Sequence, residues 1–308
     1  MRGGRNSTVM AVLSAMVVAG LAVSGFFMHV HWLSALLSLA VYAAAAVSLG
    51  YVNSNSFLFT TDSKLLYLPF MMVSLALPHS QELTLTHAAV FLTVWTIYYA
   101  LMFVNGEGHR LYHLFMSALT SAMAALMVPS LLFVCVFILL YCVYLRGQDV
   151  MRLLMAGLSA VVLPVLYILA WMFIFPGEKS AGEFFSAYAE SLVPVLPSLP
   201  EQWTPYVFYL VFIVLFGIRA LIFVLSKSGE RNKAQKNAFG LSVALSVIVL
   251  LCGLFFNRAT SVAVALVPFS FPVFDFLTDG RKAEVRIWMS LLILLTAALR
   301  VQELWPVI

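Results

Sequence analysis

Charged side chains are scarce in this chain. Asp, Glu, Lys and Arg make up 10% of its 308 residues, whereas 63% of the residues are apolar. Ordinary soluble domains carry charge on about a quarter of their residues. A surface with so little charge cannot face water over its whole extent, so lipid must cover most of it. The composition therefore predicts an integral membrane protein and excludes an ordinary soluble domain.

Cysteine is rare as well, and the short motifs of common enzyme classes are missing. The 3 cysteines, Cys135, Cys142 and Cys252, all lie in apolar runs, where a thiol behaves as a small hydrophobe. The sequence contains no Cys-x-x-Cys pair, phosphate-binding loop, dinucleotide-binding turn or Gly-x-Ser-x-Gly elbow. It therefore predicts no metal site and no cofactor, and it argues against ATP hydrolysis and hydride transfer.

Long polar stretches are absent, so residues 1–308 are expected to form a single transmembrane domain. A helix needs about 20 residues to cross the hydrocarbon core of a bilayer, and the apolar runs do not alternate as barrel strands would. The sequence therefore predicts an all-α polytopic bundle. We expect about eleven spans, near residues 9–28, 33–51, 65–78, 87–104, 111–127, 130–145, 153–175, 204–225, 238–256, 259–277 and 287–304.

The positions of Lys and Arg predict the orientation, because cytoplasmic loops are enriched in these residues. With a cytoplasmic N-terminus, all 17 basic residues except Lys179, Arg258 and Arg300 fall on or near the cytoplasmic side. This asymmetry predicts an outward C-terminus and a crossing by the short segment 65–78. The basic residues are spread over several loops, so the net charge of +4 does not indicate a nucleic-acid partner.

Two connections between spans stand out. Residues 226–237 are polar, basic and expected in the cytoplasm, either as a topology anchor or as a contact with anionic lipid headgroups. Residues 176–203 form the longest connection and are expected outside. Within this outward loop, apolar residues recur at helical intervals over 181–193, which predicts a short helix on the membrane interface.

Two rows of small residues predict close helix packing. They have a spacing of four and consist of Ala11, Ala15 and Ala19 in the first span, and Ser117, Ser121 and Ala125 in the fifth. Small side chains on one helix face let two backbones approach closely in lipid. We expect both rows to face neighbouring helices of the same chain.

Ionisable residues near the outward side are the candidates for chemistry, because charge inside a membrane is costly and often functional. Arg258 and Arg300 predict an anion site suited to a lipid-linked phosphate, since a guanidinium can bind phosphate at two points. A salt bridge to Glu190 or Glu303 is the structural alternative for these arginines. Glu183 and Glu190, in the outward loop, are the candidates for a catalytic acid or base.

Two further charges lie in spans nearer the cytoplasmic side. Asp275 follows Pro268 and Pro272, and prolines four residues apart must kink or break a helix. We expect them to interrupt the tenth span. The freed backbone groups would line a cavity or find other partners, with Asp275 near the inner face beside a basic residue. Arg219 is expected to extend its side chain to the cytoplasmic surface.

Two stretches, Asn53 to Pro69 and Arg146 to Tyr167, resemble an uncharacterised family of multi-pass bacterial inner-membrane proteins of similar length. In the second stretch, an inner basic loop leads to a helix with a Gly and then a Pro before Tyr. The resemblance implies a location in a bacterial inner membrane. It implies no activity.

Three functions remain open at this point, and whether the chain is an enzyme is undecided. A membrane subunit or scaffold of a cell-envelope assembly complex explains the missing catalytic motif, with membrane lipids and other envelope membrane proteins as partners. A glycan polymerase or transferase acting on polyprenyl-linked sugars would use the outward loop and bind a polyprenyl-linked phosphate. A transporter would need ionisable groups near the middle of the membrane, and the sequence lacks them.

The charge asymmetry makes a prediction about topology. A reporter fused after Lys233 should lie in the cytoplasm, and one fused near Ser186 should be exported, because one span separates the two positions. Alkaline phosphatase and green fluorescent protein fusions measure this directly. If both positions report the same side, the predicted orientation fails.

Overall fold

The computed structural model describes residues 3–28, 32–55, 67–77, 80, 82–105, 110–146, 150–174, 181–194, 206–230, 232–255 and 258–304. Within these ranges the chain is helical and has no strand, which confirms the predicted all-α class. The α-helices are α1 (Gly3–Met28), α2 (Trp32–Asn55), α3 (Tyr67–Ala76), α4 (Leu85–Asn105), α5 (Arg110–Met127), α6 (Leu132–Arg146), α7 (Val150–Ile174), α8 (Ala181–Glu190), α9 (Val207–Ser226), α10 (Lys233–Phe255), α11 (Arg258–Asp279) and α12 (Lys282–Leu304). Two 3-10 helices, η2 (Pro129–Leu131) and η4 (Ser228–Glu230), lie between them.

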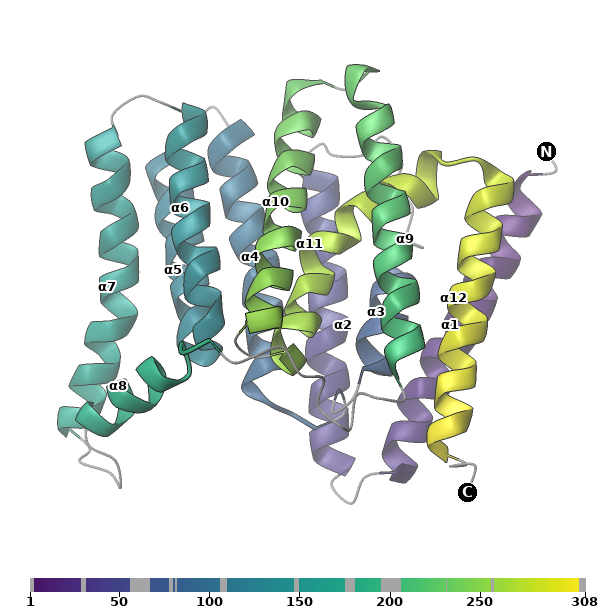
Figure 1. The fold of residues 1–308 in the computed structure, drawn as a ribbon, viewed down its shortest axis with the longest axis horizontal. Helices are drawn as coiled ribbons and strands as arrows, with labels where there is room; N and C mark the ends of the chain where they lie inside the picture. The colour runs from purple at the N-terminus through teal and green to yellow at the C-terminus, as the bar shows by residue number, and fades with distance from the viewer. Residues whose placement is uncertain are drawn as a thin grey trace.

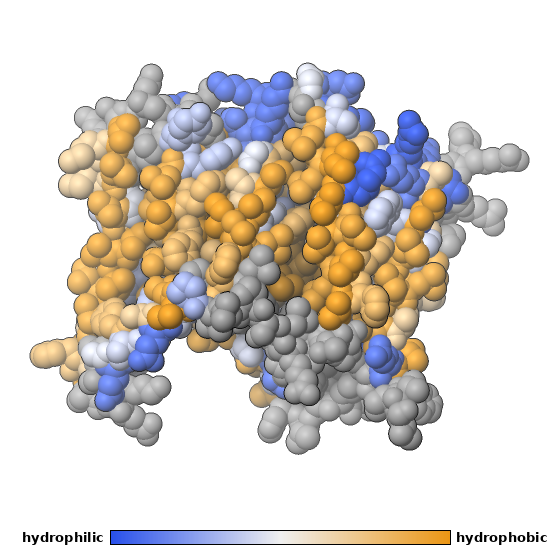
Figure 2. Space-filling model, in the orientation of Figure 1, coloured by the Kyte–Doolittle hydropathy of each residue, from blue (hydrophilic) through white to orange (hydrophobic). Residues whose placement is uncertain are grey.

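Several of these helices could cross a membrane. Among the described residues, 6 segments are long and apolar enough: Trp32–Val52, Leu85–Asn105, Leu154–Ile174, Val207–Ser226, Gln235–Cys252 and Val262–Asp279. Shorter apolar segments occur at Met10–Ser24, Tyr67–Ala76 and Pro129–Cys142. Figure 2 shows a broad apolar belt across the face in view, with hydrophilic residues gathered along its upper edge. The protein is therefore a helical membrane bundle.

The long helices stand side by side in an extended row (Figure 1). In this view α7 lies at one end, next to α5 and α6, and α12 and α1 lie at the other end. The central part contains α2, α3, α4, α10 and α11, with α9 between this part and α12. The two termini lie on opposite faces of the bundle.

The most buried part of the bundle is formed by α3, α4 and α11. In α3 all residues from Pro69 to Ala76 are buried, and α3 packs against α1, α2, α11 and α12. A helix that is apolar on all sides belongs in such an interior. The 10 residues of α3 rise about 15 Å, which is about half of a hydrocarbon core. A crossing at this position therefore needs the residues on both sides of α3.

In contrast, α7 is an edge helix. Only 11% of its apolar segment Leu154–Ile174 is buried, compared with 61% for the corresponding segments of α4 and α11. It packs on α5 and α6. Large side chains such as Leu166, Trp171 and Phe173 are exposed along it. Lipid is the environment that such a surface requires, since water would leave all of this apolar area unfavourably hydrated.

One of the two predicted rows of small residues packs as expected. In α5, Ser117, Ser121 and Ala125 are all buried. The Ser117 hydroxyl donates to the carbonyl of Thr96 in α4 at 3.1 Å, and the Ser121 hydroxyl donates to the thiol of Cys135 in α6 at 3.2 Å. The row therefore lies where α5 meets two neighbours.

The prediction is wrong for the row in α1, where Ala15 and Ala19 are exposed. Because α1 lies at the end of the bundle (Figure 1), a large part of its surface has no helix to face. Its buried side consists instead of residues such as Ser14 and Leu21, and it packs on α3 and α12.

The predicted interruption of the tenth span is also wrong. Helix α11 is continuous from Arg258 to Asp279, with Pro268 and Pro272 inside it. Each proline removes one backbone N–H, yet its fixed φ is compatible with a helix, so the chain bends instead of breaking. Figure 1 shows α11 curving over its second half toward the start of α12. The bend places the end of α11 between α9 and α12.

A glycine lets α9 and α11 approach closely. Gly217 is buried in α9, and a Cβ atom built on it would lie 2.7 and 2.9 Å from ring carbons of Phe269 in α11. Any larger residue would have to displace this ring. Small residues at helix contacts play this role widely in membranes.

We therefore predict that Gly217→Ala lowers the free energy of unfolding by about 1–3 kcal/mol, the usual cost of overpacking. Unfolding in mixed detergent micelles measures it. Gly20→Ala in α1 is the control, because a Cβ atom there meets nothing within 4 Å. Alanine is favoured over glycine in a helix by about 0.5–1 kcal/mol, so the control should match or exceed the wild type. Equal behaviour of the two variants would contradict the packing argument.

Candidate functional site

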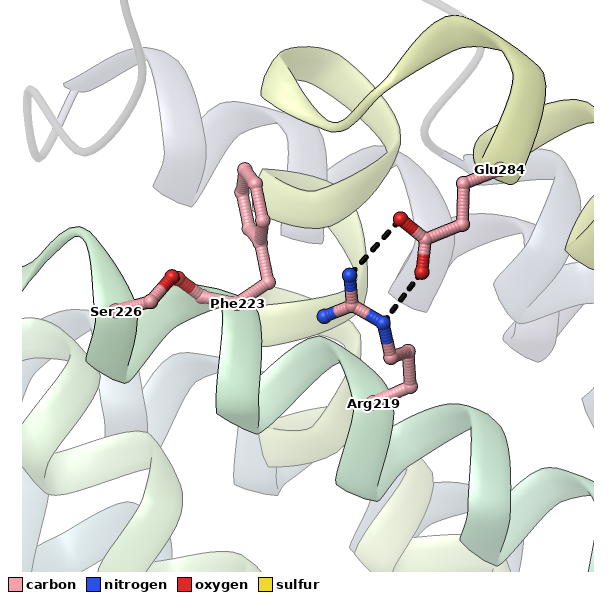
Figure 3. Close-up of polar contacts among 4 residues, drawn as sticks. All are labelled: Arg219, Phe223, Ser226 and Glu284. Carbon is pink, nitrogen blue, oxygen red and sulfur yellow. Dashed lines mark hydrogen bonds and ion pairs between the residues drawn. The ribbon is translucent and has the colours of Figure 1, made fainter.

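The candidate site lies where α9, the end of α11 and the start of α12 meet. Arg219 in α9 faces Glu284 in the first turn of α12 (Figure 3). The arginine Nε and Nη2 atoms donate to the two carboxylate oxygens, with Nη2 2.8 Å from Oε2. A guanidinium and a carboxylate paired at two points form a stronger and more specific contact than a single hydrogen bond.

Aromatic rings surround this ion pair. The guanidinium carbon of Arg219 lies 5.2 Å from the ring centroid of Phe276 in α11, which is within the range of a cation–π contact. Phe216 and Trp288 stack on each other with centroids 5.4 Å apart and planes 8° apart. They lie about one turn from Arg219 and Glu284 on the same two helices.

The surroundings make the pair stronger than an ordinary surface salt bridge. The Arg219 and Glu284 side chains are 31% and 27% exposed. Partial removal of water lowers the effective dielectric constant and strengthens the attraction between the charges. Glu284 also lies at the N-terminus of α12, where the helix dipole favours a negative charge. The pair therefore joins α9 to α12 at a place where neither charge could be buried singly.

A lysine completes this corner of the bundle. Lys227 caps the C-terminus of α9, and its Nζ lies 3.5 Å from the backbone carbonyl of Asp279 at the end of α11. The same ammonium lies 4.9 Å from the ring centroid of Phe223. A cation is favourable here because the last carbonyls of a helix carry partial negative charge.

Sequence reasoning identified Arg219 but missed its partner. We expected the Arg219 side chain to extend to the surface, and it turns to Glu284 instead. A signal was present, since Arg219 is the one charge in its apolar run and Glu284 lies near the start of the last span. Only the packing of α9 beside α12 shows that these two charges lie at the same depth.

A second polar cluster joins α2, the turn after α3, and α4. His87 is 2% exposed, and its Nδ1 accepts the backbone N–H of Thr84 at 3.2 Å. Its Nε2 lies 2.9 Å from the Ser80 carbonyl and 2.7 Å from the Ser38 hydroxyl, and that hydroxyl also donates to the same carbonyl.

These contacts assign a structural role to His87. Because Nδ1 accepts a hydrogen bond from the backbone N–H of Thr84, the ring N–H must be on Nε2, where it donates to the Ser80 carbonyl. His87 is the third residue of α4 and reaches back to the residue before the helix, as the acid does in a capping box. One side chain thus caps α4 and holds the turn after α3 against α2.

The structure does not show the predicted anion site of Arg258 and Arg300 as a pair. The Arg300 Nε donates to the Ser24 hydroxyl at 2.7 Å and Nη2 donates to the Leu21 carbonyl at 3.3 Å, which joins α12 to α1. Arg258 begins α11, but its side chain lies outside the described residues, as does that of Glu303. The shared site remains a prediction.

Glu183 and Glu190 lie in α8, the short helix predicted within the outward loop, and both are exposed. The Tyr188 hydroxyl donates to the Ala125 carbonyl of α5 at 3.0 Å, which attaches α8 to this part of the bundle. Burial raises the pKa of the Tyr188 phenol. Figure 1 shows α8 beneath α5 to α7, while α12 lies at the other end of the molecule. The structure therefore does not bring the two glutamates to Arg300, and a catalytic role for them remains a prediction.

The remaining predicted residues lie inside the bundle. Pro268 and Pro272 are buried, and Asp275 is 3% exposed. Asp275 lies one turn before the end of α11, and a basic partner for it remains a prediction. In the part of the chain that the structure describes, no group of three or more His, Cys, Asp and Glu side chains could hold a metal ion.

Comparison of the chain with protein-family models, curated proteins and solved structures found no match. The resemblance to bacterial inner-membrane proteins therefore remains a prediction. The fold and the site define a class of protein, a helical membrane bundle with an ion pair that joins two helices near one face.

The pairing of Arg219 and Glu284 predicts a coupled loss of stability. Arg219→Gln or Glu284→Gln should each cost about 1–3 kcal/mol, because each leaves a partly buried charge without its partner. The double variant should cost clearly less than the sum, since two amides can pair and no charge remains. Unfolding in mixed micelles measures the cycle, with Lys233→Gln as an exposed control expected to change stability by under about 0.5 kcal/mol. Additive losses would show that the two residues act independently.

Proposed function

We propose that this chain is a multi-pass inner-membrane subunit that serves as a scaffold in a cell-envelope assembly complex. The observation that supports this proposal most is the use of polar side chains between helices. Arg219 pairs with Glu284, Arg300 binds α1, and the buried Tyr209 hydroxyl lies 3.0 Å from that of Thr296. His87 joins α4 to α2. In each case the polar group is engaged by another helix of the same chain.

Such contacts suit a fixed framework. Polar contacts between membrane helices contribute about 0.6 kcal/mol each on average, so their main effect is to set which helix faces lie together. A transporter uses intramembrane ionisable groups that exchange partners during its cycle. Here the polar side chains named above form contacts between helices that are distant in sequence, such as α1 and α12.

The same proposal includes the topology. Eleven crossings with a cytoplasmic N-terminus require the termini to lie on opposite sides, and Figure 1 agrees with this requirement. The short α3 would complete its crossing together with its flanking residues. The resemblance described above supports a bacterial inner membrane, and the distribution of Lys and Arg supports the orientation.

The placement of the two glutamates favours a scaffold over a lipid-linked glycan polymerase or transferase. That enzyme would need an outward acid or base beside an anion site. Glu183 and Glu190 are exposed on α8, whereas Arg300 binds α1 at the other end of the bundle. The proposed catalytic and anion-binding groups are thus separated.

Complementation of a deletion strain tests the proposed function. Glu183→Gln and Glu190→Gln should each restore the wild-type phenotype, because a scaffold does not use either carboxylate chemically. His87→Ala should reduce the amount of folded protein and the phenotype together, since it removes a buried structural contact. Quantitative proteomics of the membrane fraction should show that the partner subunits decline in the deletion strain and return with both glutamine variants.

The opposite pattern would identify an enzyme. If Glu183→Gln or Glu190→Gln abolishes complementation while the amount of protein and its partners stays normal, the scaffold function is wrong. Unchanged levels of every other envelope membrane protein in the deletion strain would contradict it as well.

A further inference from the structure

The corner formed by Arg219, Lys227 and Glu284 has hydrogen-bond donors that the ion pair does not use. In Figure 3 the Nη1 atom of Arg219 points away from Glu284 toward the side of Phe223. Its Nε and Nη2 atoms donate to Glu284, and Nη1 has no acceptor among the described residues. Because Glu284 and the Phe276 ring hold the guanidinium in place, these free N–H groups have a fixed direction.

Basic residues outnumber exposed acids at the end of α9 and the start of α12. Arg219 pairs with Glu284, so these two charges balance. The other charged residues on these segments include four basic ones, Lys227, Arg281, Lys282 and Arg286, and two exposed acids, Asp279 and Glu230. Arg281, Lys282 and Arg286 are exposed at the start of α12. Figure 2 shows hydrophilic surface in this region, between the upper ends of α9 and α12, directly above the apolar belt. These basic residues would attract an anion to this surface.

Large apolar side chains are also exposed on α9 and α12. On α9, Ile218 and Ile222 are 46% and 54% exposed, and on α12, Ile287 and Leu294 are 60% and 64% exposed. Exposed apolar side chains on the two helices that carry the basic residues suit a phospholipid, whose acyl chains lie along helices while its phosphate stays at the interface. Basic sites between membrane helices bind anionic headgroups in this way.

We propose that the corner of α9, α11 and α12 binds the phosphate group of an anionic phospholipid in the adjacent leaflet. Arg219 Nη1 and Lys227 donate to the phosphate oxygens, and Lys282 adds charge at the rim. Glu284 acts as a positioning residue, because it orients the guanidinium without using Nη1. The site does not depend on the scaffold function.

Native mass spectrometry of the purified full chain in a neutral detergent tests this site. Phosphatidylglycerol and phosphatidylcholine are added in turn, and bound lipid is counted per protein. We expect the wild type to retain phosphatidylglycerol in preference to phosphatidylcholine. Lys227→Gln combined with Lys282→Gln should weaken the binding of phosphatidylglycerol by about fivefold for each lysine removed.

Two matched variants separate a specific site from general surface charge. Lys233→Gln with Lys236→Gln removes the same charge from exposed positions on α10, and this variant should bind phosphatidylglycerol as the wild type does. Arg219→Gln with Glu284→Gln leaves the net charge unchanged yet removes the Nη1 donors, so its affinity should fall. Thermal unfolding of each variant checks that it is folded.

Three results would overturn the proposal. Equal losses in the two lysine pairs would show binding by charge without a site. Unchanged affinity in the folded Arg219 and Glu284 double variant would exclude Arg219 as a ligand. Glycerol phosphate should not displace phosphatidylglycerol at equal concentration, because it lacks acyl chains to contact α9 and α12. Full displacement would identify a soluble phosphate site in place of a lipid site.

Discussion

Hydrocarbon offers no hydrogen-bond partner, so polar groups within a membrane bundle must find partners inside the chain. Hydroxyl groups in the central helices illustrate this constraint. Thr93 and Ser242 donate to carbonyls one turn earlier in their own helices, at 2.7 and 2.9 Å. Thr96 donates across the interface to Thr120 at 2.9 Å. Small hydroxyl side chains can therefore be buried between helices at little cost, and this allows α4, α5 and α10 to pack closely.

The same constraint explains where charge is accepted. Arg219 and Glu284 are tolerated because each forms hydrogen bonds that the other would otherwise form with water. Phe276 also covers one face of the guanidinium. The bend of α11 positions this aromatic ring. An interruption at Pro268 and Pro272 would have exposed backbone groups deep in the bundle, whereas a bend keeps α11 helical and directs its end toward α12. The prolines thus shape the corner without contributing to its chemistry.

Asymmetry between the two ends of the bundle follows from burial. Near α12 the polar contacts bridge helices that are far apart in sequence, such as Arg300 and Ser24. Toward α7 the polar contacts join helices closer in sequence, such as Thr96 of α4 and Thr120 of α5, and α8 is attached through Tyr188 to α5. An edge helix with most of its surface toward lipid depends on apolar contact, because a polar bridge needs a neighbour on the other side.

The sequence by itself determined the class of protein and most of the helices. Long apolar runs, the scarcity of charge and the row of Ser117, Ser121 and Ala125 depend on local composition and spacing, which the chain carries wherever it folds. It also identified Arg219 as unusual. Only the tertiary structure decided that Glu284 is its partner, that Arg300 binds α1, and that Glu183 and Glu190 lie far from Arg300. These relations depend on which helices become neighbours and on the direction in which each helix face points. The same apolar runs could pack in several arrangements, so local sequence does not specify which distant residues meet.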